Sequence, residues 1–388
     1  MSLTLQPRLR LDIGWGDLVS ALGPAPGDWR AALEALWQRP ALPCLSVRTA
    51  FDALLQAIDA KPGDEIVLSA VNIESMAAVA RAHHVTLVPV DVDIATMAPS
   101  PKAMRDAITP RTRLILIAHL FGARLSLAPY AGVKPDGVLL VEDCAQAWRP
   151  DFAPSPEADV SLLSFGPIKR RTALGGAVAL FRDAPLANTC AAIEAGYAPM
   201  SEGWFVRRAL KYCALKVATT PLIYRAVHTL VQALTGDAEK AIGAAARGFP
   251  PGELLVRLRR RPPQRMLKLM HRRLTTPVSD AERVAANRDV LGRLPLAMAS
   301  IAAGIPDHHY WLTPILLDDP GAASDALVRR GFDATRGATS LRAIETDERK
   351  APNARALMER VLYLPPPFKL NAERREALAR DVREVAGD

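Results

Sequence analysis

The chain has 388 residues and a formal net charge of +8, with 49% apolar and 23% charged residues. This composition excludes a largely disordered protein and is typical of a globular chain long enough for two domains. The N-terminal sequence lacks the apolar run of a signal peptide, and no apolar stretch reaches the roughly 20 residues that span a bilayer. We therefore expect a cytoplasmic protein.

The cysteines agree with that location. None of the four forms a CxxC pair, and all stand in apolar or helix-like surroundings. This pattern favours buried thiols in a reducing compartment over disulfides or a zinc site, so no metal is expected. The four are Cys44, Cys144, Cys190 and Cys213.

The positive charge is concentrated in one segment. Residues 196–274 hold fifteen Lys and Arg against four Asp and Glu, a net charge of +11, which leaves about −3 for the rest of the chain. An explanation of the overall charge must therefore concern this segment.

Short apolar runs alternate with helix-like stretches between residues 46 and 183. Short buried strands separated by helices predict a mainly parallel sheet with helices on both faces. We expect strands at 65–71, 85–92, 113–120, 138–143, 158–165 and 175–181, and helices at 51–60, 76–84 and 101–108.

A second pattern begins near residue 279. A helix is expected at 281–294, a strand at 309–317, and further helices at 322–332 and 372–385, which predicts a small α+β domain. Pro and Gly residues divide the basic segment into short helices. The expected division is an N-terminal arm (1–30), a large α/β domain (31–195), a basic helical insert (196–278) and a small C-terminal domain (279–388).

Two motifs carry the chemistry. VEDCAQA (141–147) places Asp143 at the C-terminal edge of a strand, where ligands collect in open α/β sheets. A carboxylate there can keep a pyridine nitrogen protonated, although helix caps and ribose or metal contacts use the same position.

SFGPIKRRTALGG (164–176) follows the next apolar run and contains Lys169. A lysine forms a Schiff base only when its amine is neutral, a state that burial and positive neighbours such as Arg170 and Arg171 favour by lowering its pKa. The alternative for this motif is a solvated basic surface loop.

With the sequences around them, these motifs resemble the DegT/DnrJ/EryC1/StrS family of sugar aminotransferases, which are fold-type-I pyridoxal-phosphate enzymes with a seven-stranded sheet. The matching series is SVRTA at Ser46, PGDEI at Pro62, VDVD at Val90, ITPRT at Ile108, HLFG at His119, EDCAQ at Glu142, SFGPIK at Ser164 and the glycine pair 175–176.

The resemblance implies a role for each matching residue. Lys169 becomes the Schiff-base lysine of pyridoxal 5'-phosphate, Asp143 the partner of the pyridinium nitrogen, and Gln146 a contact to the ring face or phenolic oxygen. Ser164 and the backbone at the start of the helix that follows Ser46 would hold the phosphate. That backbone belongs to Arg48 and Thr49, and Asn72 stands where the family has an aromatic ring on the cofactor.

The reaction implied is amino transfer, because dehydratase relatives carry histidine at the position of Lys169. The donor would be glutamate by family habit, the acceptor a keto group of a sugar-like or lipid-linked compound, and the protein a homodimer. The family's GYNYRM-like stretch, which reaches the neighbouring subunit's site, has no counterpart here. A non-catalytic binding or scaffold protein is therefore the alternative.

The basic insert contains an amphipathic helix. Arg265, Lys268 and Arg272 share one face, and three apolar residues with the same spacing share another. Three interpretations remain open: packing on the chain's own partner subunit, contact with an anionic membrane surface or lipid-linked substrate, and nucleic-acid binding. The last lacks a recognition motif.

The membrane interpretation places the protein peripherally on the inner face of the membrane. Apolar side chains would then enter the headgroup boundary, and arginines would pair with lipid. The apolar side chains would include Trp204, Phe205, Leu267 and Met270, and the arginines Arg259, Arg260, Arg261, Arg265 and Arg272.

Overall fold

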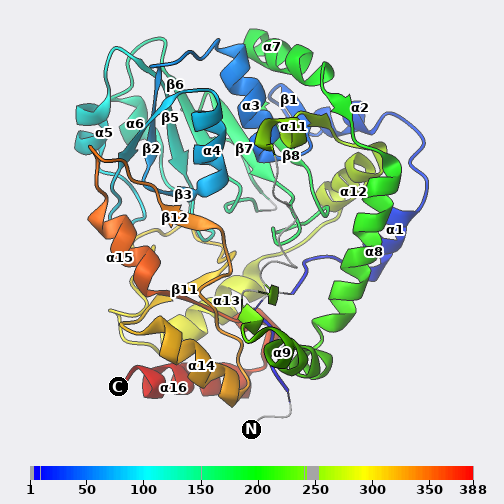
Figure 1. Ribbon diagram of the computed structural model, residues 1–388, viewed down its shortest axis with the longest axis vertical. Coiled ribbons are helices and arrows are strands. Elements are labelled where there is room, and N and C mark those ends of the chain that lie inside the picture. Colours follow the sequence, from blue (N-terminus) through cyan, green and yellow to red (C-terminus); the bar gives the residue numbers. More distant parts are fainter. Residues whose placement is uncertain (1–3, 9, 150, 240, 243–252, 388) are drawn as a thin grey trace.

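The computed structural model describes residues 4–8, 10–149, 151–239, 241–242 and 253–387. Part of the expected N-terminal arm and of the basic insert lies outside these ranges. The described chain has a large α/β part and a smaller part built around its C-terminal segment (Figure 1). No described helix is long and apolar enough to cross a membrane.

A seven-stranded sheet forms the centre of the large part, in the order β1-β8-β7-β6-β5-β2-β4. Strand β8 runs antiparallel to both of its neighbours, and the other pairs are parallel. The predicted mainly parallel sheet is thus confirmed. Its strands are β1 (Ala41–Cys44), β2 (Glu65–Ser69), β4 (Thr86–Val90), β5 (Thr112–Ala118), β6 (Leu139–Asp143), β7 (Val160–Ser164) and β8 (Ala177–Phe181).

Helices cover both faces of this sheet. On one face α3 (Val47–Ala57), α4 (Glu74–Ala82) and α7 (Ala184–Ala195) share a buried apolar core with the strands, and on the other α5 (Pro101–Ala107) and α6 (Ala128–Ala131) share a second. Three of these helices are preceded by a residue whose side chain accepts a backbone N–H of the first turn, and this hydrogen bond stabilises that turn. These caps are Ser46, Ser100 and Asp183.

The C-terminal part is a small α+β unit with a core of its own. Strand β11 (Thr313–Leu316) pairs antiparallel with β13 (Val361–Leu364), and helices pack around the pair. A further pair, β3 (Val71–Ile73) with β12 (Leu341–Ala343), joins this segment to the large part. Its helices are α13 (Ala281–Leu291), α14 (Pro320–Arg330), α15 (Pro352–Arg360), the short η1 (Pro367–Lys369) and α16 (Ala372–Ala386).

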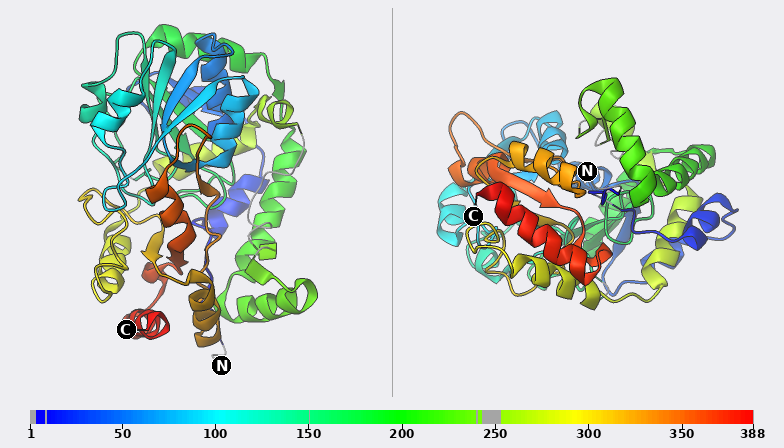
Figure 2. Two further views of the ribbon diagram at one scale, coloured as in Figure 1. Left: turned by 60° about the vertical axis from the view of Figure 1, so that its left-hand side comes forward. Right: turned by 90° about the horizontal axis from the view of Figure 1, so that it is seen from below.

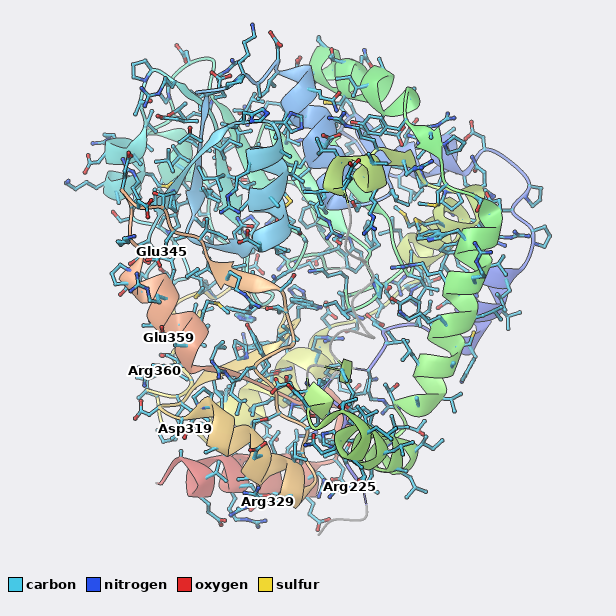
Figure 3. All side chains as sticks on the ribbon, viewed as in Figure 1. Arg225, Asp319, Arg329, Glu345, Glu359 and Arg360 are labelled. Atoms are coloured by element: carbon cyan, nitrogen blue, oxygen red, sulfur yellow. The ribbon has the colours of Figure 1, made fainter. Side chains whose placement is uncertain are left out.

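The remaining elements lie along one side of the molecule (Figures 1 and 2). Helix α8 runs from the large part towards α9, which lies beside the C-terminal part, where Arg225 donates to the carbonyl of Val328 at 3.3 Å (Figure 3). Besides α1 (Trp15–Leu22) and α2 (Trp29–Glu34), they are β9 (Ala198–Pro199), α8 (Glu202–Ala218), α9 (Pro221–Thr235), α11 (Leu254–Leu258), β10 (Arg260–Arg261) and α12 (Gln264–Thr275).

Helix α12 is an internal element. Leu267 and Met270 are at most 1% exposed, in a core shared with α1, α8 and strands β7 and β8, and Phe205 of α8 is fully buried in the same core. The prediction that these three side chains enter a lipid headgroup region is therefore wrong. Their apolar face is already covered by the chain's own sheet, a contact that the helical pattern alone does not reveal.

Several of the predicted lipid-facing cations are also engaged within the chain. Arg259 forms an ion pair with Asp52 at 3.1 Å, and Arg272 pairs with Asp17 at 2.8 Å. Arg265 donates to the carbonyl of Gly23 at 3.0 Å. Much of the basic charge of α11 and α12 therefore stabilises the fold.

Candidate active site

A cavity of about 980 Å³ opens at the edge of the sheet where β6 and β7 end. The sequence-predicted residues Arg48, Gln146, Ser164 and Lys169 all line it, although 121 positions separate the first from the last. They meet because the carboxyl ends of parallel strands and the start of the helix after β1 lie at the same edge.

Lys169 lies partly buried in the cavity wall, in the loop after β7. Its Nζ atom is 4.2 Å from the centre of the indole ring of Trp311. Burial lowers the pKa of Lys169, the charge of Asp143 raises it and the positive charge of Arg48 lowers it, and the net result is a pKa of about 8. The amine is consequently neutral in a substantial fraction of molecules near neutral pH, as a nucleophilic lysine requires.

The adjacent arginines do not supply the charge that the sequence suggested. Arg170 is buried and forms ion pairs with Asp12 and Asp280. Arg171 is also buried, so the interpretation as a solvated basic loop is wrong. The cation that acts on Lys169 comes from Arg48, which is distant in sequence.

Asp143 ends strand β6 and is 4% exposed. Burial raises its pKa, whereas the N–H of Ala145, which donates to Oδ1 at 2.9 Å, and the charge of Lys169 lower it. A buried carboxylate of this kind is best stabilised by a cationic partner such as a protonated ring nitrogen.

Gln146 is held in place by the backbone. Its Oε1 atom accepts the N–H of Phe121 at 2.9 Å, which leaves its amide nitrogen as the donor at the cavity wall. Phe121 belongs to the HLFG motif. The same motif contributes His119, which accepts the N–H of Leu125 at Nδ1 and lies 3.0 Å from Glu142 at Nε2. These contacts fix the strand end that carries Asp143.

Three predicted residues, Asp143, Thr49 and Asn72, are not among those that line the cavity. Thr49 donates its N–H to the capping Ser46 and its hydroxyl to the carbonyl of Leu258, and it is not among the cavity-lining residues. The helix start at the cavity is instead formed by Val47 and Arg48. Asn72 is 1% exposed in β3 and lies behind the lining residue Ile73.

The two polar atoms of the Asn72 side chain differ in their hydrogen bonding. Its Oδ1 atom accepts the N–H of Ile73 at 2.7 Å, while its buried Nδ2 atom has no partner among the described residues. Its contact with a cofactor ring stays a prediction.

Other lining residues were not predicted to lie at the site, although Trp204 was expected at a lipid surface. Trp311 comes from the segment before β11, and Trp204 and Arg208 come from α8. An isolated tryptophan or arginine in a helical stretch carries no local signal for a site. Only the packing of α8 and the C-terminal part against the large part brings them to Lys169.

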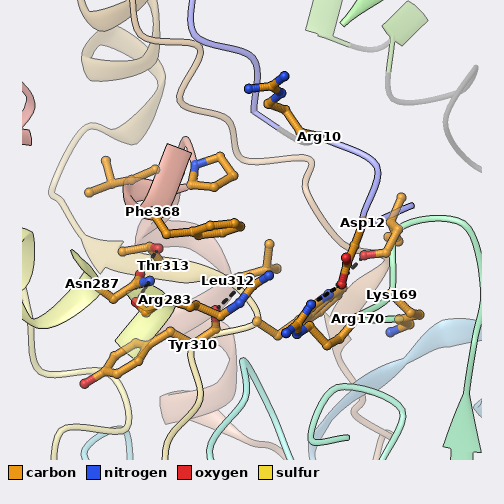
Figure 4. Close-up of a pocket in the computed structure, with 14 residues that line it drawn as sticks. Arg10, Asp12, Lys169, Arg170, Arg283, Asn287, Tyr310, Leu312, Thr313 and Phe368 are labelled. Atoms are coloured by element: carbon orange, nitrogen blue, oxygen red, sulfur yellow. Dashed lines mark hydrogen bonds and ion pairs between the residues drawn. The ribbon is translucent and has the colours of Figure 1, made fainter. Parts of the chain in front are cut away.

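A smaller cavity of about 40 Å³ shares part of its lining with the large one. Lys169 stands at one end of it and Asn287 at the other, with Phe368 stacked 3.9 Å over the guanidinium of Arg283 (Figure 4). Trp311 and Lys169 line both cavities.

Comparison with known proteins matches part of this chain to a family of enzymes. The profile of the DegT/DnrJ/EryC1/StrS aminotransferase family matches residues 31–203. This part of the chain is similar to members of that family. The family match covers the strands, the helix start and the lysine loop described above.

The chain is similar to several characterised proteins. It is 35% identical over 99 residues to a 3-amino-5-hydroxybenzoate synthase of Amycolatopsis mediterranei, covering 25% of this chain and 26% of that protein. It is 30% identical over 148 residues to a UDP-N-acetyl-3-dehydro-alpha-D-glucosamine 3-aminotransferase of Acidithiobacillus ferrooxidans, covering 37% and 40%. The chain thus matches about a quarter of the length of the first of these relatives.

The likeness of fold extends further. The crystal structure of the aminotransferase TlmJ from Streptoalloteichus hindustanus superposes with a TM-score of 0.68 at 18% identity, over 99% of both chains. The fold is therefore that of fold-type-I pyridoxal-phosphate enzymes, including the C-terminal part that the sequence motifs do not reach.

Proposed function

We propose that this chain is a pyridoxal-phosphate-dependent aminotransferase that transfers an amino group to a keto group of a sugar-like acceptor. The observation that carries the proposal is Lys169 with its lowered pKa in the wall of a large cavity, next to the buried carboxylate of Asp143. The family match and the aminotransferases among its relatives support the same reaction.

The residues present fit the cofactor. When bound, pyridoxal phosphate supplies an aldehyde and an electron-withdrawing ring. Lys169 offers the amine that attaches to the aldehyde, and Asp143 offers an anionic partner for the ring nitrogen. Ser164 and the first turn of α3 offer hydrogen-bond donors and a helix dipole to an anion.

Lys169 then has a second task. Once an amino donor has displaced it, its Nζ atom can move a proton at the substrate carbon as a general base and acid. Its pKa of about 8 suits both directions of transfer near neutral pH. Asp143 would pair with the ring nitrogen of the bound cofactor, and Gln146 would orient the ligand through its amide nitrogen.

The substrates follow from the same proposal. The resemblance favours glutamate as the donor and a homodimer as the working form. The two relatives described above act on different acceptors, to judge by their names, so the acceptor is assigned only to the class of keto compounds with a sugar-like ring.

Spectroscopy tests the proposal directly. Apo-protein mixed with pyridoxal phosphate should develop a visible absorption band, and Lys169→Ala should abolish it. Addition of glutamate or another amino donor should then bleach the band of the wild type. A protein that binds the cofactor but is bleached by none of a panel of donors favours the non-catalytic scaffold, and one that takes up no cofactor contradicts the enzyme.

A second proposal concerns where the enzyme works, because exposed apolar side chains gather on two neighbouring helices. On α9 the residues Leu222, Leu230 and Leu234 are 59–75% exposed and share one face at spacings of four and eight residues. On α8, Leu210 and Val217 are also exposed, by 52% and 44%.

The charge of these helices favours an anionic partner. Helix α9 contains no acidic residue, and the one acidic residue of α8, Glu202, accepts the backbone N–H groups of Gln264 and Arg265. A second copy of the chain would bring like charges together. We therefore assign this surface, in place of α12, to an anionic membrane at the inner face, where a sugar-like acceptor carried on a lipid would be found.

A further inference from the structure

The charged side chains around the large cavity are strongly unbalanced. Four arginines and Lys169 line it, against a single carboxylate, Glu74. Glu74 forms an ion pair with Arg81 at 2.6 Å, so it is already neutralised on the helix surface. The arginines are Arg48, Arg208, Arg257 and Arg260. Such a cavity attracts anions.

Arg208 is fixed within this wall. Its guanidinium carbon lies 5.2 Å from the ring centre of Trp204 and 5.4 Å from that of Tyr212, one helical turn away on either side. Its Nε atom donates to the carbonyl of Leu174. Among the described residues no carboxylate forms an ion pair with it, and burial lowers its pKa. A partly buried cation held by these contacts is pre-organised for an anionic ligand.

Arg48, in helix α3, lines the same cavity. Its Nη1 atom donates to the hydroxyl of Ser75 at 3.3 Å. Both arginines line the same cavity, and burial, followed by the positive charge of Arg208, lowers the pKa of Arg48 to about 10. An anion between them would relieve this repulsion. Arg48 also sits in the first turn of α3, where the helix dipole and backbone N–H groups favour negative charge.

We propose that Arg48 and Arg208, which line the same cavity as Lys169, form a phosphate-binding subsite beside it. Its first occupant is the phosphate of the cofactor, and a phosphate carried by the acceptor is the other source of the same chemistry. Two arginines and a helix start suit a dianion better than a carboxylate, because each guanidinium can donate two parallel hydrogen bonds to phosphate oxygens. For the cofactor, the inference rests on the proposed function.

The comparison of pyridoxal phosphate with pyridoxal isolates the phosphate. We expect Arg208→Gln to weaken the binding of pyridoxal phosphate to apo-protein about 10- to 100-fold, the loss of one or two charge-assisted hydrogen bonds. The binding of pyridoxal, which has no phosphate, should not change. Dissociation constants from the visible band provide this measurement without any turnover. Arg48→Gln should reduce the preference in the same way.

Arg207 provides a matched control. It is the neighbouring arginine of α8, is exposed, and does not line the cavity. Arg207→Gln removes the same charge from the same helix and should leave the preference for the phosphorylated cofactor intact. An equal effect of both substitutions would mean general electrostatics and would overturn the subsite.

Inorganic phosphate distinguishes the two sources. If the subsite holds the cofactor's phosphate, phosphate ion should compete with pyridoxal phosphate in the wild type and not in Arg208→Gln. If it holds a phosphate of the acceptor, phosphate ion should bind the cofactor-loaded wild type, by calorimetry, and not the variant. The inference is wrong if Arg208→Gln matches the wild type in both arms.

Failure of the proposed function has a different signature. A wild type that takes up neither pyridoxal phosphate nor pyridoxal contradicts the proposed enzyme. Phosphate ion alone still tests the subsite in that protein, because calorimetry needs no cofactor: Arg208-dependent binding supports the subsite, and its absence overturns it.

Discussion

Met270 of α12 fills the space that a side chain at position 176 would occupy. A Cβ atom on Gly176 would lie 2.2 Å from the Sδ atom of Met270, and the φ angle of this glycine is +87°. The second glycine of the pair after the lysine loop is therefore needed both for the backbone conformation and for the docking of α12.

Gly176→Ala should consequently destabilise the protein by about 2–4 kcal/mol, the combined cost of a left-handed alanine and of an overpacked core. Adding Met270→Ala should relieve the clash but not the backbone strain, so the double variant should lose less than the sum of the single ones. Urea unfolding of the four proteins measures this coupling. Strict additivity would contradict the contact.

The N-terminal segment is held to the lysine loop by buried charges, and this attachment should depend on pH. Asp12 pairs with Arg170 and Arg273. Burial alone would raise its pKa, but the charge of Arg170, the N–H of Arg171 and the charge of Arg273 lower it from 3.8 to about 2.

A depressed pKa in the folded state contributes stability that is present above the unfolded value and is lost as pH falls towards 2. Asp12→Asn should cost about 2 kcal/mol near neutral pH and progressively less below about pH 4. Thermal unfolding along a pH series tests this, with Asp106→Asn, which removes an exposed ion pair, as the near-neutral control. A cost that does not change with pH would exclude the ionic origin.

The lowered pKa of Lys169 predicts the pH profile of cofactor uptake. Only the neutral amine attacks an aldehyde, so the rate of uptake should rise as pH increases through about 8 and then level off. Arg48→Gln removes a positive charge that lowers this pKa, and its profile should shift to higher pH. Stopped-flow absorbance gives both midpoints. An unshifted midpoint in Arg48→Gln would disconnect the two side chains.

Membrane association should depend on α9 and not on α12. The protein should sediment with vesicles of anionic lipid at low salt, less so as salt screens the charge. The double substitution Leu230→Glu with Leu234→Glu should abolish sedimentation, whereas Leu296→Glu, at a residue 77% exposed elsewhere on the molecule, should not. Wild-type protein that stays in the supernatant at low salt rules out the membrane surface.

The sequence by itself predicted the sheet of the large part and the loop that brings Lys169 to the cavity. The alternation of short apolar runs and helices predicts the sheet, because buried parallel strands must be apolar on both faces. Asp143, Ser164 and Lys169 follow directly from the strand ends that carry them, since a residue next to a buried strand has little freedom to be elsewhere. The glycine pair and the capping Ser46 are local in the same sense.

Only the tertiary structure decided which distant segments complete the cavity. Trp311 and Arg208 reach Lys169 through the packing of whole helices and strands, which no local pattern records. The same reason explains the error over α12: an amphipathic helix shows that one face will be covered, but whether a lipid surface or the chain's own sheet covers it depends on contacts made far away in sequence. Met270 against Gly176 is such a contact.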